Sequence, residues 1–257
     1  MDTPTALWLS KLTSDFYQRV NASFAATRQA PWQGWEQALR AAGLLSQKDG
    51  CAVSRNGEPL SVLDLACGNL RFERYLASCG FLVCCHAYDN CDELVQEGTA
   101  ALLLEQAQAK IDYHHLDIAQ VLLSGQTLSQ RLAPTPCSLS VCFGFMHHVP
   151  LASSREQVLQ ALVDHTCTGG HVIVSFWQFA NSKRIMAKAQ RVGTDEGDYL
   201  LGWQGSMDVR RYCHSFAEAE IDALVASCAP HVHELARFSA DGKEQNLNRY
   251  LALRVIE

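Results

Sequence analysis

The chain has 257 residues, of which 48% are hydrophobic and 19% charged, as expected for one globular domain. No apolar run reaches the ~18 residues that a membrane-spanning helix needs. The N-terminal segment also lacks the basic and apolar regions of a signal peptide. We therefore expect a cytoplasmic protein that does not associate with a membrane. The net charge of −6 argues against tight, unaided binding of nucleic acid, because such proteins usually carry a basic surplus.

The cysteines and histidines follow no familiar metal-binding pattern. The 11 cysteines are scattered from Cys51 to Cys228, and none forms a C-x-x-C pair. Several, such as Cys84, Cys85 and Cys142, lie in apolar runs, which indicates buried free thiols in a reducing compartment. The 10 histidines show no H-E-x-x-H spacing. The sequence therefore predicts no metal site.

The spacing of apolar residues predicts the elements in chain order. Two amphipathic helices are expected at 7–27 and 32–45, and the charged stretch 46–59 is expected to be a loop. From residue 61 onward, short apolar runs alternate with amphipathic segments. The predicted strands are 61–67, 81–89, 110–117, 138–146, 171–179, 231–238 and 248–256. The predicted helices between them are 71–78, 91–108, 153–165 and 216–228.

This alternation predicts an α/β, Rossmann-like fold. Right-handed crossovers would place the strands in one mostly parallel sheet of about seven strands, with helices on both faces. The last two strands, joined by a short polar connection, should form an antiparallel hairpin at the edge. We expect a single domain over 1–257, in which 1–58 is a helical extension or lid and 180–215 an irregular insertion. Ligands of such folds bind outside the carboxyl ends of the strands.

The first predicted strand ends in D-L-A-C-G-N-L-R, residues 64–71. The small residues Ala66 and Gly68 would let a ligand approach the backbone closely. A dinucleotide site would need a further glycine where the pyrophosphate meets the helix N-terminus. Leu70 and Arg71 occupy that place, which disfavours a pyrophosphate and permits a ligand without one. The alternative is an ordinary tight turn.

Acidic residues end the second and third predicted strands. Asp89 stands 21 positions after the glycine of the first loop, a spacing at which a carboxylate can accept hydrogen bonds from both ribose hydroxyls. Asp117 could accept from an adenine amino group, although either acid could instead cap the following helix. After the fourth strand, Phe143 would line an apolar adenine pocket or belong to the core. Of His147 and His148, at least one should face the cleft.

In order, D-L-A-C-G-N, A-Y-D-N, L-D-I and the strand ending in H-H resemble the motifs of class I S-adenosylmethionine-dependent methyltransferases, over roughly residues 60–180. The resemblance implies S-adenosyl-L-methionine as cofactor, S-adenosyl-L-homocysteine as product, and a reversed seventh strand. The cofactor-binding residues would then be Asp64, Ala66 and Gly68 at the methionine end, Asp89 at the ribose, Asp117 with Ile118 at the adenine, and Asn90 and Phe143 beside them.

Three further segments resemble the eukaryotic tRNA wobble-uridine carboxymethyl methyltransferases. Residues 24–32 (F-A-A-T-R-Q-A-P-W) resemble their F-S-x-T-R-x-x-P-W, residues 197–203 their G-D-x-x-x-P-W, and residues 211–216 (R-Y-C-H-S-F) their R-Y-Y-H-V-F. Ala66 and Leu70 stand where that group has glycine. This resemblance implies tRNA modification, by O-methylation of a carboxylate on a wobble uridine, and a small zinc-containing activator protein as partner.

Methyl transfer from a sulfonium is an in-line displacement, so the reacting atoms must be aligned and water excluded. A carboxylate nucleophile is ionised at neutral pH and needs no general base. We expect Arg211 to hold it bidentately, with Tyr212 or His214 as additional donors. The alternative for Arg211 is a structural ion pair. A hydroxyl or amine nucleophile would instead need His148 or His214 as its base.

The remaining candidates concern the acceptor side and the lid. Residues 180–215 would form an acceptor-side insertion, and Trp177 would add to the acceptor wall or belong to the core. Arg28 and Trp32 would close over the cofactor or simply pack the N-terminal helix. Two other functions stay open. The acidic charge favours methylation of a small molecule, and a non-catalytic module that binds S-adenosylmethionine is disfavoured by the intact set of strand-end acids.

Overall fold

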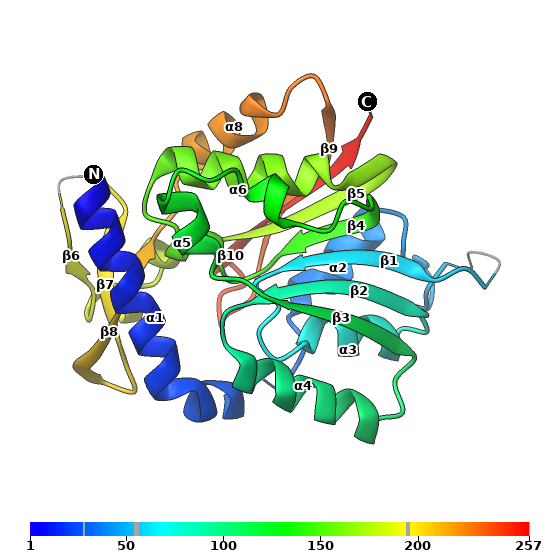
Figure 1. Ribbon diagram of the computed structural model, residues 1–257, viewed down its shortest axis with the longest axis horizontal. Coiled ribbons are helices and arrows are strands. Elements are labelled where there is room, and N and C mark those ends of the chain that lie inside the picture. The colour runs from blue at the N-terminus through cyan, green and yellow to red at the C-terminus, as the bar shows by residue number, and fades with distance from the viewer. Residues whose placement is uncertain (28, 54–56, 194–195, 257) are drawn as a thin grey trace.

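The computed structural model describes residues 1–27, 29–53, 57–193 and 196–256 (Figure 1). No helix in these ranges is long and apolar enough to cross a membrane. The α-helices are α1 (Thr3–Ala26), α2 (Gln33–Ala41), α3 (Arg71–Ser78), α4 (Asp92–Leu104), α5 (Ile118–Leu123), α6 (Ala152–Asp164), α7 (Lys183–Met186) and α8 (Glu218–Ser227). The short 3₁₀ helices are η1 (Leu128–Arg131), η2 (Met146–His148) and η3 (Phe179–Asn181).

One sheet of seven strands forms the centre, in the order β3-β2-β1-β4-β5-β10-β9. Its strands are β1 (Leu60–Leu65), β2 (Val83–Asp89), β3 (Ala109–His115), β4 (Cys137–Cys142), β5 (Thr166–Trp177), β9 (Val232–Ala240) and β10 (Asn248–Val255). The pairs among β1 to β5 are parallel, whereas β10 runs antiparallel to both β5 and β9. The predicted sheet, its terminal hairpin and its reversed seventh strand are confirmed. Because β1 lies between β2 and β4, a crevice opens at their carboxyl ends.

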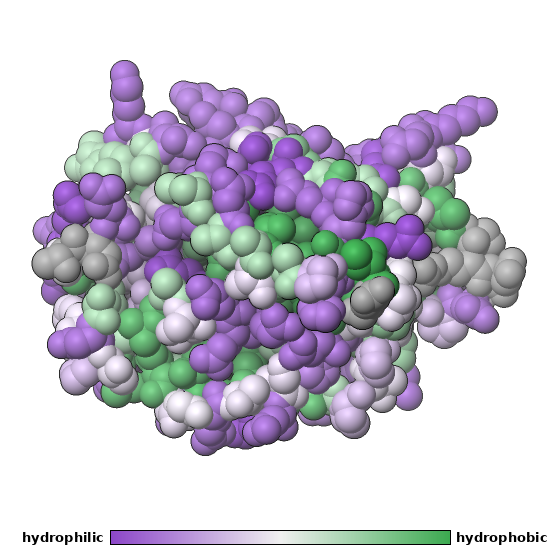
Figure 2. Space-filling model, turned by 90° about the horizontal axis from the view of Figure 1, so that it is seen from above, coloured by the Kyte–Doolittle hydropathy of each residue, from purple (hydrophilic) through white to green (hydrophobic). Residues whose placement is uncertain are grey.

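Helices cover both faces of this sheet, as predicted (Figure 1). On one face, Leu159 of α6 and Ile221 of α8 belong to a core that α5 also joins. On the other face, Leu39 of α2 and Val95 of α4 belong to a second core. Seen from above, over α6 and α8, the surface is mostly hydrophilic with smaller apolar groups between (Figure 2). This is the pattern of amphipathic helices. All 11 cysteines are free thiols, as predicted.

The stretch 180–215 is not irregular, contrary to the prediction. It contains β6 (Gln190–Arg191), β7 (Asp198–Trp203) and β8 (Ser206–His214), which form a second, antiparallel sheet in the order β6-β7-β8. Gln204 and Gly205 join β7 to β8 with φ angles of 48° and 90°. Two successive positive φ angles are typical of the type I′ turn that favours tight hairpins. The connection after β3 also holds α5 and η1, which the apolar spacing does not predict.

The long helix α1 packs against β8 beside the crevice, next to the small sheet (Figure 1). Two hydrogen bonds tie them together. The backbone amide of Tyr212 donates to Thr13 Oγ1 at 3.1 Å, and Trp203 Nε1 donates to Ser23 Oγ at 3.0 Å. Phe16 of α1 is buried and meets Trp203 edge to face, with ring centroids 6.1 Å apart. The N-terminal helix and the second sheet therefore form one wall beside the crevice together.

Candidate active site

A cavity opens at the carboxyl ends of β1, β2 and β4. It holds about 1210 Å³ of atom-free space, including its open mouth. Nearly all the predicted cofactor residues line it: Asp64, Ala66, Gly68, Asp89, Asn90, Asp117, Ile118 and Phe143, together with Trp32 and His148. Arg28 lies outside the described residues. The strand-end prediction thus brings its residues to one place, and α1 adds residues from the opposite wall, among them Thr13 and Tyr17.

The loop after β1 is held in a left-handed backbone conformation. Ala66 has φ 65°, Gly68 φ 55°, and Leu70, just before α3, φ 52°. This conformation costs a residue with a side chain roughly 1–2 kcal/mol, so Ala66 and Leu70 must be held there by their surroundings. Gly98 of α4 provides the room, since a Cβ on it would lie 2.3 Å from the carbonyl oxygen of Asn69 and 2.9 Å from Leu70 Cβ.

Asp89 ends β2, and its two carboxylate oxygens accept hydrogen bonds from backbone amides in two different loops. Oδ2 accepts from the amide of Gly68 at 2.8 Å, and Oδ1 accepts from the amide of Cys91 at 2.9 Å. Burial raises the pKa of Asp89, while these amide donors act in the opposite direction. Each oxygen keeps a second lone pair, so the carboxylate can still accept from two neighbouring hydroxyls. That capacity fits the diol of a ribose.

Beneath the loop, Asp64 is paired with a second acid, Glu73 of α3. Both side chains are buried, and neither Asp64 Oδ1 nor Glu73 Oε2 has a hydrogen-bond partner among the described residues. Burial, and then the charge of Glu73, raise the pKa of Asp64 well above its usual value. A proton held on one of the two acids would let them share a hydrogen bond and would avoid two buried negative charges side by side. Sequence reasoning missed Glu73, because an acid in the first turn of a helix is ordinarily exposed.

The side of the cavity at which the adenine is expected is apolar, with one acid at its rim. Asp117 caps α5, since its Oδ1 accepts from the amide of Gln120 at 2.9 Å. Its cap role and its place in the cavity therefore coexist. Ile118 is buried beside it, and Phe143 packs edge to face on Phe72, with ring centroids 4.8 Å apart. Such a surface suits a flat, apolar ring with a polar edge.

A second cavity adjoins the first, and both are lined by Tyr17, Trp32 and Gly144. It holds about 1030 Å³ of atom-free space, including its mouth. Trp32 stands at the junction, where a Cβ on Gly144 would lie 3.1 Å from its ring. Arg211 of β8 and Trp177 of β5, both predicted on the acceptor side, line the second cavity.

Arg211 has an unusual environment for a buried cation. Its side chain is only 6% exposed, and no carboxylate among the described residues pairs with it. One terminal nitrogen donates to the carbonyl of Gly202 at 3.2 Å, while Nε has no hydrogen-bond partner. Aromatic rings surround the guanidinium, with the ring centroids of Phe16, Trp177 and Trp203 at 4.6, 5.9 and 5.9 Å. Arg211 therefore does not form, among the described residues, the structural ion pair that was the alternative to a role in binding the acceptor.

His148 lines the first cavity, and both of its ring nitrogens are hydrogen-bonded. Nδ1 donates to the carbonyl of Tyr212 at 2.7 Å, so Nε2 accepts from the Tyr17 hydroxyl at 2.8 Å. Burial and the nearby charge of Arg211 lower the pKa of His148 to about 3. The ring is neutral at pH 7 and a weak base. Tyr17 was missed from the sequence because it belongs to a helix more than a hundred residues away along the chain.

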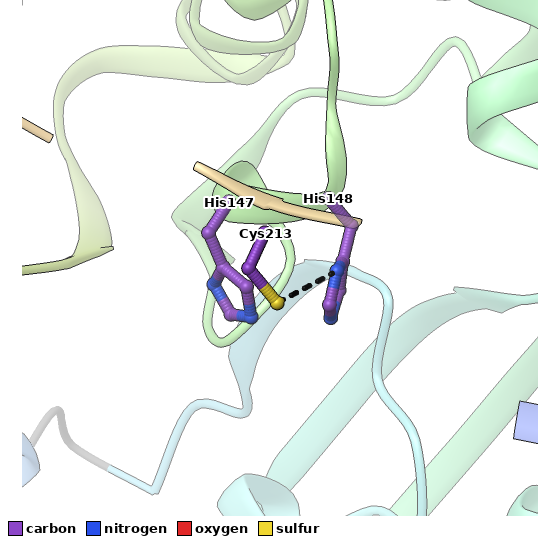
Figure 3. Close-up of side chains that lie close together, drawn as sticks. All are labelled: His147, His148 and Cys213. Atoms are coloured by element: carbon purple, nitrogen blue, oxygen red, sulfur yellow. Dashed lines mark hydrogen bonds between the residues drawn. The ribbon is translucent and has the colours of Figure 1, made fainter. Parts of the chain in front are cut away.

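Two other groups lie close to His148. The rings of His147 and His148 flank the thiol of Cys213, whose sulfur lies 4.0 Å from His148 Nδ1 (Figure 3). Burial raises the pKa of Cys213 to about 12, so the thiol is protonated. His147 lines the second cavity and packs on Trp177, with ring centroids 4.8 Å apart. His147 is thus a further candidate for contact with an acceptor.

Tyr212 and His214 line neither cavity, so the structure does not bring these two predicted catalytic residues to the site. Tyr212 donates its hydroxyl to Asp198 at 2.5 Å. His214 contacts Asp198 at 2.6 Å through Nδ1 and Glu220 at 2.8 Å through Nε2. Burial alone would lower the pKa of His214, but these two carboxylates raise it. Side chains alternate between the two faces of a strand, so those of Tyr212 and His214 point away from the face that carries Arg211. Their hydrogen bonds anchor the small sheet instead.

The strand order and directions of this sheet are those of solved S-adenosylmethionine-dependent methyltransferases, so the fold is the one these enzymes share. No protein-family model matches the chain. A protein of Encephalitozoon cuniculi (strain GB-M1) that is provisionally named a methyltransferase is 25% identical over 230 residues, which cover 89% of each chain.

Solved structures share the fold at lower identity. The magnesium protoporphyrin IX methyltransferase of Synechocystis PCC 6803, with bound S-adenosylhomocysteine, has a TM-score of 0.60 and 16% identity, covering 95% of this chain and 97% of its own. The N-methyltransferase NodS of Bradyrhizobium japonicum WM9, with the same ligand, has a TM-score of 0.59 and 14% identity, covering 94% and 99%.

Proposed function

We propose that this protein is an S-adenosylmethionine-dependent methyltransferase that methylates a carboxylate oxygen of its acceptor. The observation that carries the proposal is Arg211, a buried cation without a carboxylate partner among the described residues. It lines a cavity that adjoins the predicted cofactor cavity. A buried charge is costly unless it is paired, so an unpaired one indicates a partner that arrives with the substrate.

In this proposal the first cavity holds the cofactor, which supplies the methyl group. The Asp89 carboxylate would accept hydrogen bonds from the ribose hydroxyls, and the apolar surface at Ile118 and Phe143 would cover the adenine. Trp32, at the junction of the cavities, and α1 would keep water from the reacting atoms. The residues present therefore fit this cofactor.

The state of His148 supports a nucleophile that needs no deprotonation. A hydroxyl or amine acceptor would have to give up a proton, and His148, the base predicted for it, lines the first cavity and is hydrogen-bonded to Tyr17, which lines both cavities. With a pKa of about 3, it would take that proton poorly at neutral pH. A carboxylate is already ionised, and Arg211 can orient both its oxygens with parallel hydrogen bonds. His148 then acts as a positioning residue that holds Tyr17.

Two kinds of acceptor bear such a carboxylate. The segments 24–32 and 211–216 favour a carboxymethylated wobble uridine of tRNA, on the resemblance described above. The acidic net charge of −6 favours a small carboxylated molecule. Protein purified without added ligand should be incubated with methyl-labelled S-adenosylmethionine and, in separate reactions, with tRNA that carries carboxymethyluridine, with unmodified tRNA, and with a metabolite extract.

Label that enters one acceptor as an alkali-labile methyl ester would support carboxylate methylation. Alkali-stable label would assign an amine or hydroxyl acceptor and refute the carboxylate. If S-adenosylhomocysteine binds but label never enters RNA, metabolites or protein, the non-catalytic module is the better reading.

The same proposal includes a small zinc-containing activator protein as partner. The outer side of β3 has no neighbouring strand among the described residues, and Leu103 and Leu104 are exposed where α4 leads into it. An unpaired strand edge beside exposed apolar residues is a common place for another chain to bind. Coexpression with such a partner should raise the yield of wild-type protein and not of Leu104→Glu. Equal yields would refute binding at this edge.

A further inference from the structure

A group of three metal-ligating side chains lies on the outer strands of the sheet, away from the cofactor cavity. His86 belongs to β2, and Asp112 and His114 belong to β3. In the parallel register His86 pairs with Asp112, and Tyr88 pairs with His114, so all these side chains share one face. None of the three lines either cavity.

Their spacing matches the coordination sphere of a small divalent cation. Asp112 Oδ2 lies 3.1 Å from His86 Nδ1 and 3.3 Å from His114 Nε2. In a tetrahedral zinc site with bonds of about 2.0–2.1 Å, two ligand atoms are about 3.3 Å apart. All three ligand atoms lie within 4.8 Å of one another.

The ring of His114 is held ready for such a role. It stacks on Tyr88, with ring centroids 4.7 Å apart and planes 15° apart, and its centroid lies 6.0 Å from that of the His86 ring, which is tilted by 32°. Its Nε2 is buried and makes no well-formed hydrogen bond, although Asp112 is near. A polar atom in that position gains a partner if a cation binds between it and the carboxylate.

We propose that His86, Asp112 and His114 bind a zinc ion or a similar divalent transition metal. Two imidazoles and one carboxylate suit zinc better than magnesium or calcium, which prefer oxygen ligands. Water would complete the coordination, as three protein ligands leave one position open. In the metal-bound state each imidazole is neutral and carries its proton on the ring nitrogen away from Asp112, so the nitrogen that faces Asp112 donates its lone pair to the metal.

The cluster of His147, His148 and Cys213 is the weaker candidate, although its ligand atoms are equally close (Figure 3). His148 uses both nitrogens in hydrogen bonds, to Tyr212 and from Tyr17. The Arg211 cation is also close enough to affect the pKa of Cys213. A second positive charge would be repelled there, whereas no arginine or lysine is paired with Asp112 among the described residues.

A bound metal ion would link β3, the outermost strand, to its neighbour β2. β3 is hydrogen-bonded on one side only within the described sheet, and β2 ends at Asp89, three residues beyond His86. Anything that binds the folded state and not the unfolded chain stabilises the fold. Zinc should therefore raise the melting temperature and slow hydrogen exchange in β3.

The test is isothermal titration of the full-length protein, freed of metal by a chelator, with zinc chloride. We expect one site per chain in wild type and at least a 100-fold loss of affinity in His114→Ala and Asp112→Asn, because even indirect supports of a metal site are worth 10–100-fold. His231→Ala, at an exposed histidine elsewhere, is the matched control and should bind as wild type. Cys213→Ser should also keep the site.

Cobalt(II) provides a second readout. Nitrogen and oxygen ligands give d–d absorption without the charge-transfer band that a thiolate ligand adds. No zinc binding in wild type would overturn the proposal. Zinc binding that persists in His114→Ala and Asp112→Asn would also overturn it. The same holds if a thiolate charge-transfer band is present in wild type and both the band and zinc binding disappear in Cys213→Ser. Circular dichroism of each variant shows whether a loss of binding reflects a loss of folding. His86→Gln gives an independent check at a partly exposed position, where we expect weaker zinc binding in a folded protein.

Discussion

Replacement of Arg211 separates a substrate-binding cation from a structural one. Arg211→Lys keeps the positive charge but loses the planar fork that can grip both oxygens of a carboxylate. Arg211→Met keeps much of the length and removes the charge. If the acceptor carboxylate is bound by this side chain, both variants should impair turnover, and the methionine variant should be the more severe.

The magnitudes follow from the contacts of the guanidinium. Lysine would retain one of two charge-assisted hydrogen bonds, and each is worth roughly 1.5–3 kcal/mol. The expected loss in kcat/KM is therefore on the order of 10–150-fold for Arg211→Lys. The effect on stability should be different. The cation lies 4.6 Å from the Phe16 ring and makes one bond to the Gly202 carbonyl, but no carboxylate among the described residues offsets its burial. Arg211→Met should therefore melt within a few degrees of wild type, or higher.

Three measurements distinguish a substrate-binding role of Arg211 from a structural one. They are initial rates with the acceptor identified by labelling, S-adenosylhomocysteine affinity by calorimetry, and thermal melting. Donor affinity should be unchanged, since Arg211 lines only the second cavity. Full activity in Arg211→Lys would refute the carboxylate hypothesis. A methionine variant that is strongly destabilised yet retains the kcat/KM of wild type would show that Arg211 is a structural residue.

Changes at three other positions test the rest of the site. Asp89→Ala should weaken S-adenosylhomocysteine binding by at least tenfold without loss of circular dichroism, because ribose hydrogen bonds are lost; an unchanged dissociation constant would remove Asp89 from the site. Gly98→Ala should cost roughly 1–3 kcal/mol, as its Cβ would lie 2.3 Å from the Asn69 carbonyl oxygen, and a melting temperature equal to that of wild type would contradict this contact. The pKa of His148 is lowered to about 3 in the folded protein, whereas a histidine of the unfolded chain titrates near 6.5. Between these values only the unfolded chain takes up the proton, so the free energy of unfolding is highest above about pH 6.5 and falls by about 1.4 kcal/mol per pH unit towards pH 3. The stability difference between wild type and His148→Gln should therefore narrow on acidification, and a constant difference would show that His148 titrates normally.

The strand-end residues could be predicted because their chemistry is local in the sequence. Asp89 and Asp117 each follow an apolar run, and the carboxyl ends of neighbouring parallel strands must meet at one edge. The roles of Tyr17 and Glu73 could not be predicted in the same way. Tyr17 reaches His148 across 131 positions, and the buried Glu73 of α3 faces Asp64 on β1. Such pairings depend on tertiary packing, which no local pattern records.

The segment 211–216 shows the limit of a motif. Its arginine lies in the second cavity, but Tyr212 and His214 turn away to bond with Asp198. A sequence motif marks residues that occur together, and it does not separate those that touch a ligand from those that hold the strand in place. Knowing that 206–214 is a strand would have sorted them by the alternation of its side chains. The Gln204-Gly205 turn was the signal for that strand.

The close approach of α4 to the loop after β1 implies that position 98 must be glycine whatever residue stands at position 70. A Cβ on residue 98 would lie 2.3 Å from the carbonyl oxygen of Asn69 and 2.5 Å from its carbonyl carbon, and every residue at position 69 carries these backbone atoms. The approach of 2.9 Å to Leu70 Cβ only adds to this clash. Relatives of this chain that carry glycine at position 70 should therefore still keep glycine at position 98, because α4 could not otherwise lie this close to the loop that lines the first cavity.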